Sequence, residues 1–296
     1  MLNRILITAI VLHAAASAQL AKFQARTHKG QSGLTVVYRL FTPAGYDPSK
    51  KYPLVLALHG AGEVGNNNTT QITVNRLATR WIDDTLQARV PHFVLAPQCP
   101  GDSTWVKYNK PLAGRPISGP LKVVLEIVDS LGREFSVDAN RVYCVGLSMG
   151  GYATWELAQR YPERWAAVVP VCGWADTTQA APLKALPIWA FHGEADPVVP
   201  VAGSRNIIAA IKKAGGTPKY TEYPGVGHDS WVQAMNDKAL PAWLFAQTRS
   251  SGSALLPLAR PEASWTRGTL RWQGLEHRPD GRVAAPAGGN APGTHR

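Results

Sequence analysis

Cysteine is scarce in this sequence, which has three, Cys99, Cys144 and Cys172, among 296 residues. No two of them have the spacing of a metal-binding pair, so the sequence predicts no metal site. Cys144 falls in an expected central strand, where a free thiol packs as a small apolar side chain. Cys99 and Cys172 end apolar runs that the expected strand order keeps apart, and this order disfavours the alternative of a disulfide between them.

Blocks of basic residues with interleaved aromatics are also absent, although 31 Lys and Arg stand against 20 Asp and Glu. Nucleic-acid-binding proteins gather such residues into a patch or stripe, so we do not expect a nucleic acid as partner. The net charge of +11 suits an anionic wall or polymer as a neighbour. The hydrophobic content of 45% predicts a globular protein with a sizeable core.

No apolar run reaches the length of a comfortable membrane span, which takes about 20 residues. The run 5–16 follows Arg4 and precedes Ala16-Ser17-Ala18, which has the A-x-A pattern of a signal-peptide cleavage site. Residues 1–18 are therefore predicted to be a signal peptide, with Gln19 as the first residue of the mature chain. We expect a secreted or periplasmic protein without stable membrane insertion, and an uncleaved anchor is the alternative.

Apolar β-type runs alternate with helical patterns between Thr35 and Gln247. The expected strands are residues 35–41, 54–58, 93–96, 141–145, 166–171, 188–191 and 219–223. The middle strands are almost continuously apolar, as parallel strands covered on both faces must be. Helical spacing recurs at Leu121, Val124, Leu125, Val128 and Leu131, and again over 201–214 and 230–246. The fold class predicted is α/β, a doubly wound and mostly parallel sheet with helices on both faces.

A glycine-flanked serine lies between one of these strands and a helix. Gly146-Leu147-Ser148-Met149-Gly150 follows the strand 141–145, and a helical pattern runs from Tyr152 to Tyr161. In this setting G-x-S-x-G is typical of a nucleophile elbow, a turn too tight for side chains at its flanks. The pattern predicts Ser148 as a catalytic nucleophile, and a purely structural turn is the alternative.

A serine hydroxyl is a weak nucleophile near neutral pH, and it needs a base that is oriented by a carboxylate. In chain order, Asp196 lies in the loop after one downstream strand and His228 in the loop after the next, the order Ser, acid, His of α/β-hydrolases. We therefore predict Asp196 as the acid and His228 as the base. Asp176 and Glu194 remain competing acids, whereas His192 lies too close to its own strand end to be the preferred base.

Small residues predict where the developing oxyanion would be bound. One backbone N–H should come from Met149, directly after the serine and at the start of a helix. The other should come from the loop 59–63, where Ala61 lies between two glycines and the backbone is free to approach a substrate. His59 in the same loop has no partner set for a metal, so a structural role is favoured.

The segment 172–186, after the expected strand 166–171, is too short for a large helical cap, so we expect an open cleft. Trp105, Trp174 and Trp231 lie close in sequence to the catalytic loops. They are predicted as substrate-binding walls, since aromatic faces stack on sugar or aryl groups, and packing of the loops is the alternative.

Four blocks of the sequence resemble a known family of exported α/β-hydrolases. They are HGAGE at 59–63, LAPQCP at 95–100, GLSMGGY at 146–152 and GVGHDSW at 225–231. Such proteins are described as polyhydroxybutyrate-depolymerase-like esterases, phospholipase/carboxylesterase-like proteins or predicted peptidases, and they are similar to carbohydrate esterase family one and dienelactone hydrolases. The resemblance covers about residues 35–246, and it implies the α/β-hydrolase fold with Ser148, Asp196 and His228 as the triad.

The function expected is a serine esterase that works through an acyl-enzyme and requires no cofactor. Its substrate would be a small-molecule or polymer-attached ester, for instance on a polysaccharide or polyester. A serine peptidase of prolyl-oligopeptidase type is an alternative, but the short region before the core leaves no room for the β-propeller such enzymes carry. The other alternative is a binding protein without catalytic activity. The catalytic domain is predicted over 19–250 and a disordered tail over 251–296, while the oligomeric state leaves no signal.

Overall fold

The computed structural model describes residues 17–107, 112–249, 270–272 and 275–277. The chain divides into two compact units, Met1–Leu256 and Pro257–Arg296. In the second unit, strand β9 (Leu270–Trp272) pairs antiparallel with β10 (Leu275–His277). Most of the predicted signal segment 1–18 lies outside the described residues, and so does the predicted tail 251–296 apart from β9 and β10. Both therefore stay predictions.

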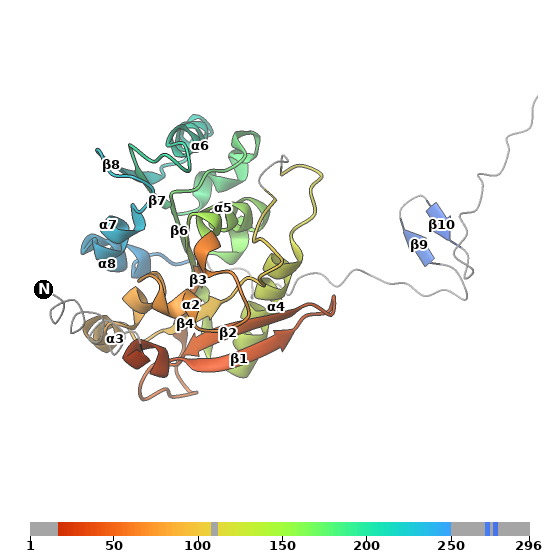
Figure 1. Ribbon diagram of the computed structural model, residues 1–296, viewed down its shortest axis with the longest axis vertical. Coiled ribbons are helices and arrows are strands. Elements are labelled where there is room, and N and C mark those ends of the chain that lie inside the picture. Colours follow the sequence, from red (N-terminus) through yellow and green to blue (C-terminus); the bar gives the residue numbers. More distant parts are fainter. Residues whose placement is uncertain (1–16, 108–111, 250–269, 273–274, 278–296) are drawn as a thin grey trace, which may run out of the picture. The chain divides into compact units, whose positions relative to one another are not determined.

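An eight-stranded sheet forms the centre of the first unit, in the order β1-β2-β4-β3-β5-β6-β7-β8 (Figure 1). The strands are β1 (Gln24–Lys29), β2 (Thr35–Phe41), β3 (Tyr52–Leu58), β4 (Phe93–Pro97), β5 (Val137–Leu147), β6 (Ala167–Val171), β7 (Trp189–Gly193) and β8 (Lys219–Tyr223). β2 runs antiparallel to both β1 and β4, and the other neighbours are parallel. This is the predicted doubly wound sheet, with β1 as a strand that the sequence did not reveal.

Helices cover both faces of the sheet. They are α2 (Thr70–Thr73), α3 (Asp84–Arg89), α4 (Gly119–Glu134), α5 (Met149–Arg160), α6 (Ala202–Lys213), α7 (Trp231–Asn236) and α8 (Ala239–Phe245). Short 3-10 turns are η1 (Ala61–Glu63), η2 (Thr79–Ile82), η3 (Pro162–Arg164), η4 (Thr177–Gln179) and η5 (Ala181–Ala185). Figure 1 shows α4, α5 and α6 on one side of the sheet and α3, α7 and α8 on the other.

The single helix predicted over 230–246 is wrong, because the structure has α7 and α8 there. α7 ends at Asn236, and Asp237 follows in an extended conformation. The carboxylate of Asp237 accepts a hydrogen bond from the amide of Ala239 at 2.7 Å. This local bond competes with the helical one, so the helix is interrupted and begins again.

The core lies on both faces of the central strands, which explains their continuous apolar sequence. In β3, Val55 and Ala57 belong to a buried cluster that includes residues of α7 and α8. The alternate residues Leu54, Leu56 and Leu58 are also fully buried, and successive side chains of a strand point to opposite faces. α5 packs against β3, β5 and β6. The helices thus fix the strand ends that carry the loops.

The turn from β5 into α5 is the tightest part of this arrangement. Ser148 has φ +51° and ψ −117°, a backbone conformation that L-residues rarely adopt. A Cβ atom at Gly146 would lie 2.1 Å from the carbonyl oxygen of Gly150, and one at Gly150 only 1.8 Å from that of Leu58. Glycine is therefore required on both sides of Ser148, as the elbow pattern predicted.

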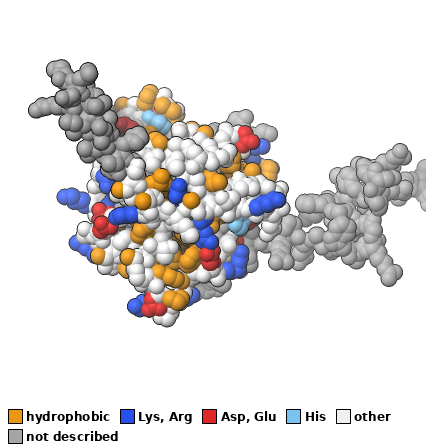
Figure 2. Space-filling view, turned by 60° about the horizontal axis from the view of Figure 1, so that its bottom comes forward, with side chains coloured by type: hydrophobic (Ala, Val, Ile, Leu, Met, Phe, Trp, Pro, Cys, Tyr) orange, Lys and Arg blue, Asp and Glu red, His pale blue; other side chains and the backbone are white. Residues whose placement is uncertain are grey.

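Charged side chains are dispersed over one face of the molecule. On the face drawn in Figure 2, the Lys and Arg side chains of the described residues lie among polar and apolar ones and form no continuous basic patch. Within the described ranges, no helix has both the length and the apolar character that crossing a membrane requires.

The glycine contacts predict a large stability difference between two substitutions. Gly150→Ala should lower the free energy of unfolding by at least about 2 kcal/mol, because the new methyl group overlaps the Leu58 carbonyl. Gly62→Ala is the control, since a Cβ there meets nothing within 4 Å, and its effect should stay within about 0.5 kcal/mol. Urea unfolding followed by tryptophan fluorescence measures both, and equal stabilities would contradict the tight contact.

Candidate active site

Ser148, His228 and Asp196 form one chain of hydrogen bonds at the carboxyl ends of the strands. Ser148 Oγ lies 2.9 Å from His228 Nε2, and His228 Nδ1 lies 2.8 Å from Asp196 Oδ2. A carboxylate only accepts, so Nδ1 carries the imidazole proton and Nε2 accepts from the serine hydroxyl. The structure thus brings together the three residues that the sequence predicted, in the geometry of a catalytic triad.

Two glycines let the loops that carry Asp196 and His228 approach each other. Gly225 has φ +67°, which favours glycine. A Cβ on Gly193, at the end of β7, would lie 2.2 Å from the carbonyl oxygen of Gly227. The His228 loop therefore folds back onto the end of β7, and this contact sets the distance between the imidazole and the carboxylate.

Both oxygens of the Asp196 carboxylate take part in hydrogen bonds. Its side chain is fully buried, and Oδ1 accepts hydrogen bonds from the amides of Val198 at 2.8 Å and Val199 at 2.9 Å. Burial by itself raises the pKa of Asp196, but the hydrogen bonds from His228 and the two amides outweigh it, and the pKa lies below its usual value. Asp196 is therefore ionised at neutral pH.

The two competing acids are engaged elsewhere. Asp176 accepts hydrogen bonds from the amides of Leu112 and Thr178, both at 3.0 Å. Glu194 accepts one from the amide of Gly225 at 3.0 Å. Neither carboxylate has a hydrogen bond to His228, so the geometry favours Asp196 over both.

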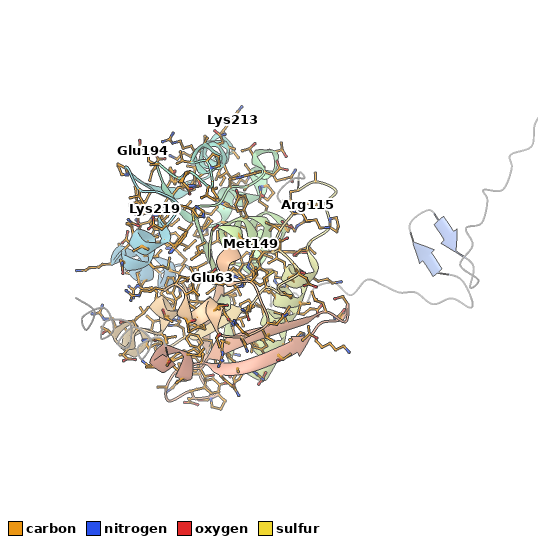
Figure 3. The ribbon with its side chains drawn as sticks, in the orientation of Figure 1. Glu63, Arg115, Met149, Glu194, Lys213 and Lys219 are labelled. Atoms are coloured by element: carbon orange, nitrogen blue, oxygen red, sulfur yellow. The ribbon has the colours of Figure 1, made fainter. Side chains whose placement is uncertain are left out.

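The loop after β3 lies beside the serine, where the sequence placed half of the oxyanion hole. A Cβ on Gly60 would be 3.6 Å from Ser148 Cβ. Ala61 is exposed and begins η1, while Met149 begins α5 and its N–H has no carbonyl within its own helix to bind. Figure 3 shows Met149 and Glu63, the last residue of η1, on these two neighbouring segments. Ala61 and Met149 as oxyanion donors stay a prediction.

His59 fixes the same loop from inside the protein. Its Nε2 accepts a hydrogen bond from the amide of Cys99 at 2.9 Å, and its Nδ1 lies 2.6 Å from the carbonyl oxygen of Gly60. Burial lowers the pKa of His59 to about 4, so the ring is neutral. Its role in the structure is to hold the loop, as the sequence analysis favoured.

The three tryptophans predicted as substrate walls have different surroundings. Trp105 is completely buried, and its indole N–H donates to the carbonyl of His59 at 3.1 Å, so its prediction as a substrate wall is wrong. Its sequence position beside the site did not show that the ring turns inward. Trp231 is half-buried, and its ring stands edge-on to His228 at 5.3 Å. Trp174 is half-buried and lines a cavity.

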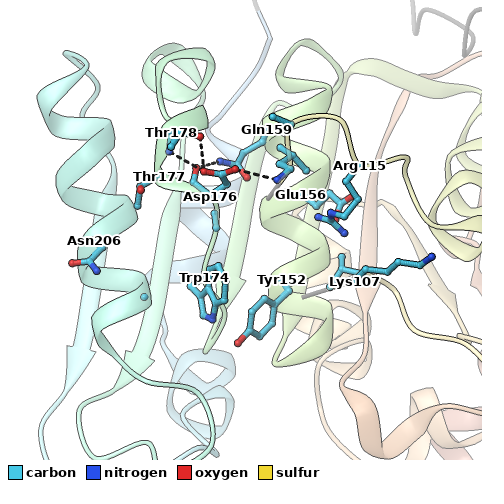
Figure 4. A pocket seen from close by; sticks show the side chains of 15 residues that line it. Lys107, Arg115, Tyr152, Glu156, Gln159, Trp174, Asp176, Thr177, Thr178 and Asn206 are labelled. Carbon is cyan, nitrogen blue, oxygen red and sulfur yellow. Dashed lines mark hydrogen bonds and ion pairs between the residues drawn. The ribbon is translucent and has the colours of Figure 1, made fainter. Parts of the chain in front are cut away.

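This cavity of about 660 Å³ lies along α5, and its lining includes Tyr152 and Glu156 but no residue of the triad (Figure 4). Tyr152, on its wall, is one helical turn after Ser148, and its amide donates to the Ser148 carbonyl at 3.0 Å. The rings of Tyr152 and Trp174 meet edge to face at 5.4 Å. Burial raises the pKa of Tyr152 to about 12, so its phenol is neutral. Aromatic rings thus line the end of the cavity at the start of α5.

The rest of the cavity wall is polar and charged. Glu156 on α5 accepts hydrogen bonds from Arg115 at 2.6 Å and from Arg160 at 2.8 Å. Gln159 and Asp176 contribute further polar groups, and Gln159 donates to the Asp176 carbonyl at 2.6 Å. The sequence did not indicate that Arg115, Tyr152 and Glu156 line a cavity. Only the spacing of four residues between Ser148 and Tyr152, which puts both on one side of a helix, could have indicated any of them.

One group of donor atoms within the described ranges has the spacing of a metal site. Atoms of Cys172, Asp196 and His228 lie within 4.8 Å of one another. Two of these residues are already hydrogen-bonded to each other, so a cation would have to displace the proton between them. Burial raises the pKa of Cys172 to about 12, which keeps it a neutral thiol. The three cysteines are free and buried.

Known proteins similar to this chain are hydrolases. Residues 47–239 match the phospholipase/carboxylesterase family. The crystal structure of a thermostable esterase superposes with a TM-score of 0.75 and 40% sequence identity, over 78% of this chain and 64% of that one. Carboxylesterase SOBER1 of Arabidopsis thaliana is 27% identical over 155 residues, which are 49% of this chain and 67% of that protein.

A peptidase is similar too. Dipeptidyl-peptidase 5 of Porphyromonas gingivalis is 28% identical over 149 residues, half of this chain. The chain spans only about a fifth of that relative's length, 21%. The family match covers most of the α/β unit and includes Ser148, Asp196 and His228. The fold is therefore the predicted α/β-hydrolase fold, and the chain belongs to the phospholipase/carboxylesterase family.

Proposed function

We propose that this protein is a serine esterase in which Ser148 is the nucleophile, His228 the base and Asp196 the acid. The observation that carries the proposal is the continuous chain of hydrogen bonds from Ser148 Oγ through His228 to the buried carboxylate of Asp196. The position of Ser148 at the strained turn before α5 also supports the proposal, because a turn of this shape exposes the serine hydroxyl at the edge of the sheet.

In the proposed reaction, His228 Nε2 takes the proton of Ser148 as Oγ attacks the ester carbonyl. The amides of Met149 and Ala61 stabilise the oxyanion of the tetrahedral intermediate. His228 then gives its proton to the departing alcohol, and an acyl-enzyme remains. A water molecule, deprotonated by His228, releases the acid and regenerates Ser148. Asp196 stays ionised throughout and holds the imidazolium, and no cofactor takes part.

The cavity, which lies along α5 and begins one helical turn after Ser148, supports substrates with a bulky, polar part. Tyr152 and Trp174 offer aromatic faces at the start of α5. Exposed polar side chains line the cavity as well, namely Lys107, Thr177 and Asn206. Such a combination suits an ester carried by a hydroxyl-rich or polymeric molecule, for instance a polysaccharide or a polyester. Only the short turns η4 and η5 occupy the segment 172–186, so this segment adds no helical cap to the site.

Export is the second part of the proposal. It rests on Arg4, the apolar run 5–16 and the cleavage pattern Ala16-Ser17-Ala18. The expected open cleft, outside the cell or in the periplasm, would give access to substrates too large to enter.

The nucleophile is tested by hydrolysis of p-nitrophenyl acetate and butyrate beside an aminoacyl p-nitroanilide. The wild type should cleave the esters faster, and Ser148→Ala should lower kcat by roughly 10³-fold or more. Ser32→Ala, which removes an exposed hydroxyl from another part of the surface, is the control and should behave as wild type. The similarity to a dipeptidyl-peptidase makes peptide hydrolysis the second candidate, and faster anilide cleavage would establish it. Hydrolysis that does not depend on Ser148 would refute the mechanism.

The choice of acid is tested by Asp196→Asn against Glu194→Gln. Asp196→Asn should reduce kcat by roughly 10³-fold, because an amide no longer favours the required imidazole tautomer or stabilises the imidazolium. Glu194→Gln removes the nearby exposed carboxylate and should keep kcat within about threefold. A larger loss in the Glu194 variant would assign the acid to Glu194 instead.

Signal cleavage predicts a defined mature N-terminus. When the full chain is produced in a host with a secretory pathway, the exported protein should begin at Gln19, as N-terminal sequencing or intact mass shows. Ala18→Arg should block processing, since a small residue is needed before the cleavage site. A mature protein that retains residues 1–18 would favour the anchor.

A further inference from the structure

A second histidine contacts the carboxylate of the proposed triad. His192 lies in β7 and is completely buried. Its Nε2 is 3.2 Å from Asp196 Oδ2, the same oxygen that His228 contacts, and 3.0 Å from the carbonyl oxygen of Val199. Its Nδ1 is 2.8 Å from Ser204 Oγ on α6. The ring is thus fixed at both nitrogens.

The partners of His192 determine which nitrogen carries its proton. The carbonyl of Val199 can only accept, so Nε2 must be the N–H of the neutral ring. The Ser204 hydroxyl lies 2.8 Å from both Nδ1 and the Gly173 carbonyl, and its single proton can be donated to only one of them at a time. The N–H at Nε2 donates to Val199 O, and Asp196 Oδ2 lies 3.2 Å from the same nitrogen. His192 thus holds an N–H beside the carboxylate of Asp196.

From this geometry we infer that His192 is a positioning residue, which orients Asp196 so that the carboxylate holds His228 in the reactive geometry. Oδ1 is fixed by the amides of Val198 and Val199, whereas the contacts of Oδ2 among the described residues are the two histidine rings. Without His192, Asp196 Oδ2 would be positioned by the His228 ring alone, and that ring must exchange protons during turnover. The inference rests on the proposed function.

The charge of His192 suits this role. Burial lowers the pKa of His192, although the Val199 carbonyl and Asp196 oppose the change. The ring is therefore neutral at neutral pH. A neutral donor orients the carboxylate and leaves its negative charge available to the imidazolium that forms on His228, whereas a second cation would compete for that charge.

Four variants separate this role from simple packing. His192→Leu should lower kcat for p-nitrophenyl acetate by about 10- to 100-fold and leave KM within about twofold. His192→Gln should restore most of the loss, because its amide N–H reaches the position of Nε2, whereas His192→Asn is too short and should not. The matched control is His92→Leu, which removes another completely buried imidazole, one bonded to the Val90 carbonyl. This control variant should have a lower free energy of unfolding and an unchanged kcat.

A double-mutant cycle with Asp196→Asn shows whether His192 acts through Asp196. In the Asp196→Asn background, His192→Leu should change kcat by less than about threefold. If the decreases in kcat of His192→Leu and Asp196→Asn multiply in the double variant, His192 does not act through Asp196 and has no positioning role. The same conclusion follows if His192→Gln has as low a kcat as His192→Asn. Circular dichroism confirms folding of each variant, and the Gln and Asn variants decide the question if His192→Leu does not fold.

A measurement without substrate keeps this inference separate from the proposed function. The His228 Nδ1 proton, bonded to a carboxylate, should give a downfield resonance in the proton NMR spectrum of the resting protein. His192→Leu should shift or broaden it, and His192→Gln should preserve it. An unchanged resonance in His192→Leu would overturn the inference, whereas absence of Ser148-dependent hydrolysis in the wild type would overturn only the proposed function.

Discussion

The rest of the structure depends on how closely α5 begins against the end of β3. The backbone of Gly150 approaches the Leu58 carbonyl more closely than any Cβ would permit, and Gly151 approaches the Val171 carbonyl at the end of β6 in the same way. The first turn of α5 is thus wedged between two strand ends. Ser148 takes its strained conformation because the chain must enter the helix from this narrow space.

The parallel order of the strands explains why groups far apart in the sequence meet at one edge of the sheet. β3, β5, β6, β7 and β8 are parallel neighbours in the sheet, so the loops after them open on the same side. The loop after β3 adjoins the serine, while those after β7 and β8 bring the carboxylate and the imidazole. Stability and the geometry of the site therefore draw on the same contacts, and the strain at Ser148 persists because the packing around it is complete.

The sequence predicted those parts of the molecule in which local pattern and tertiary environment agree. The bounds of β2 and β8 coincide with the expected ranges, and Ser148, Asp196 and His228 lie in the turns and loops after β5, β7 and β8. β1 was not visible, because its residues are polar and its order comes from pairing with β2. The break at Asp237 depends on one side-chain hydrogen bond that hydrophobic periodicity does not record.

Side-chain direction marks the limit of such reasoning. Trp105 and Trp174 lie in similar positions relative to the catalytic loops, yet one ring is completely buried beneath His59 and the other lines the cavity. The Arg115–Glu156 pair joins segments 41 residues apart, and only the folded chain brings them together. Sequence order could place residues at the correct edge of the sheet, but not decide which of them face the substrate.

The three free thiols have a consequence for how the protein is made. Because this fold closes without any covalent cross-link between its strands, folding needs neither an oxidant nor a disulfide isomerase. The fold itself shields the three thiols, because all of them are buried, and only an unfolded chain exposes them to an oxidant.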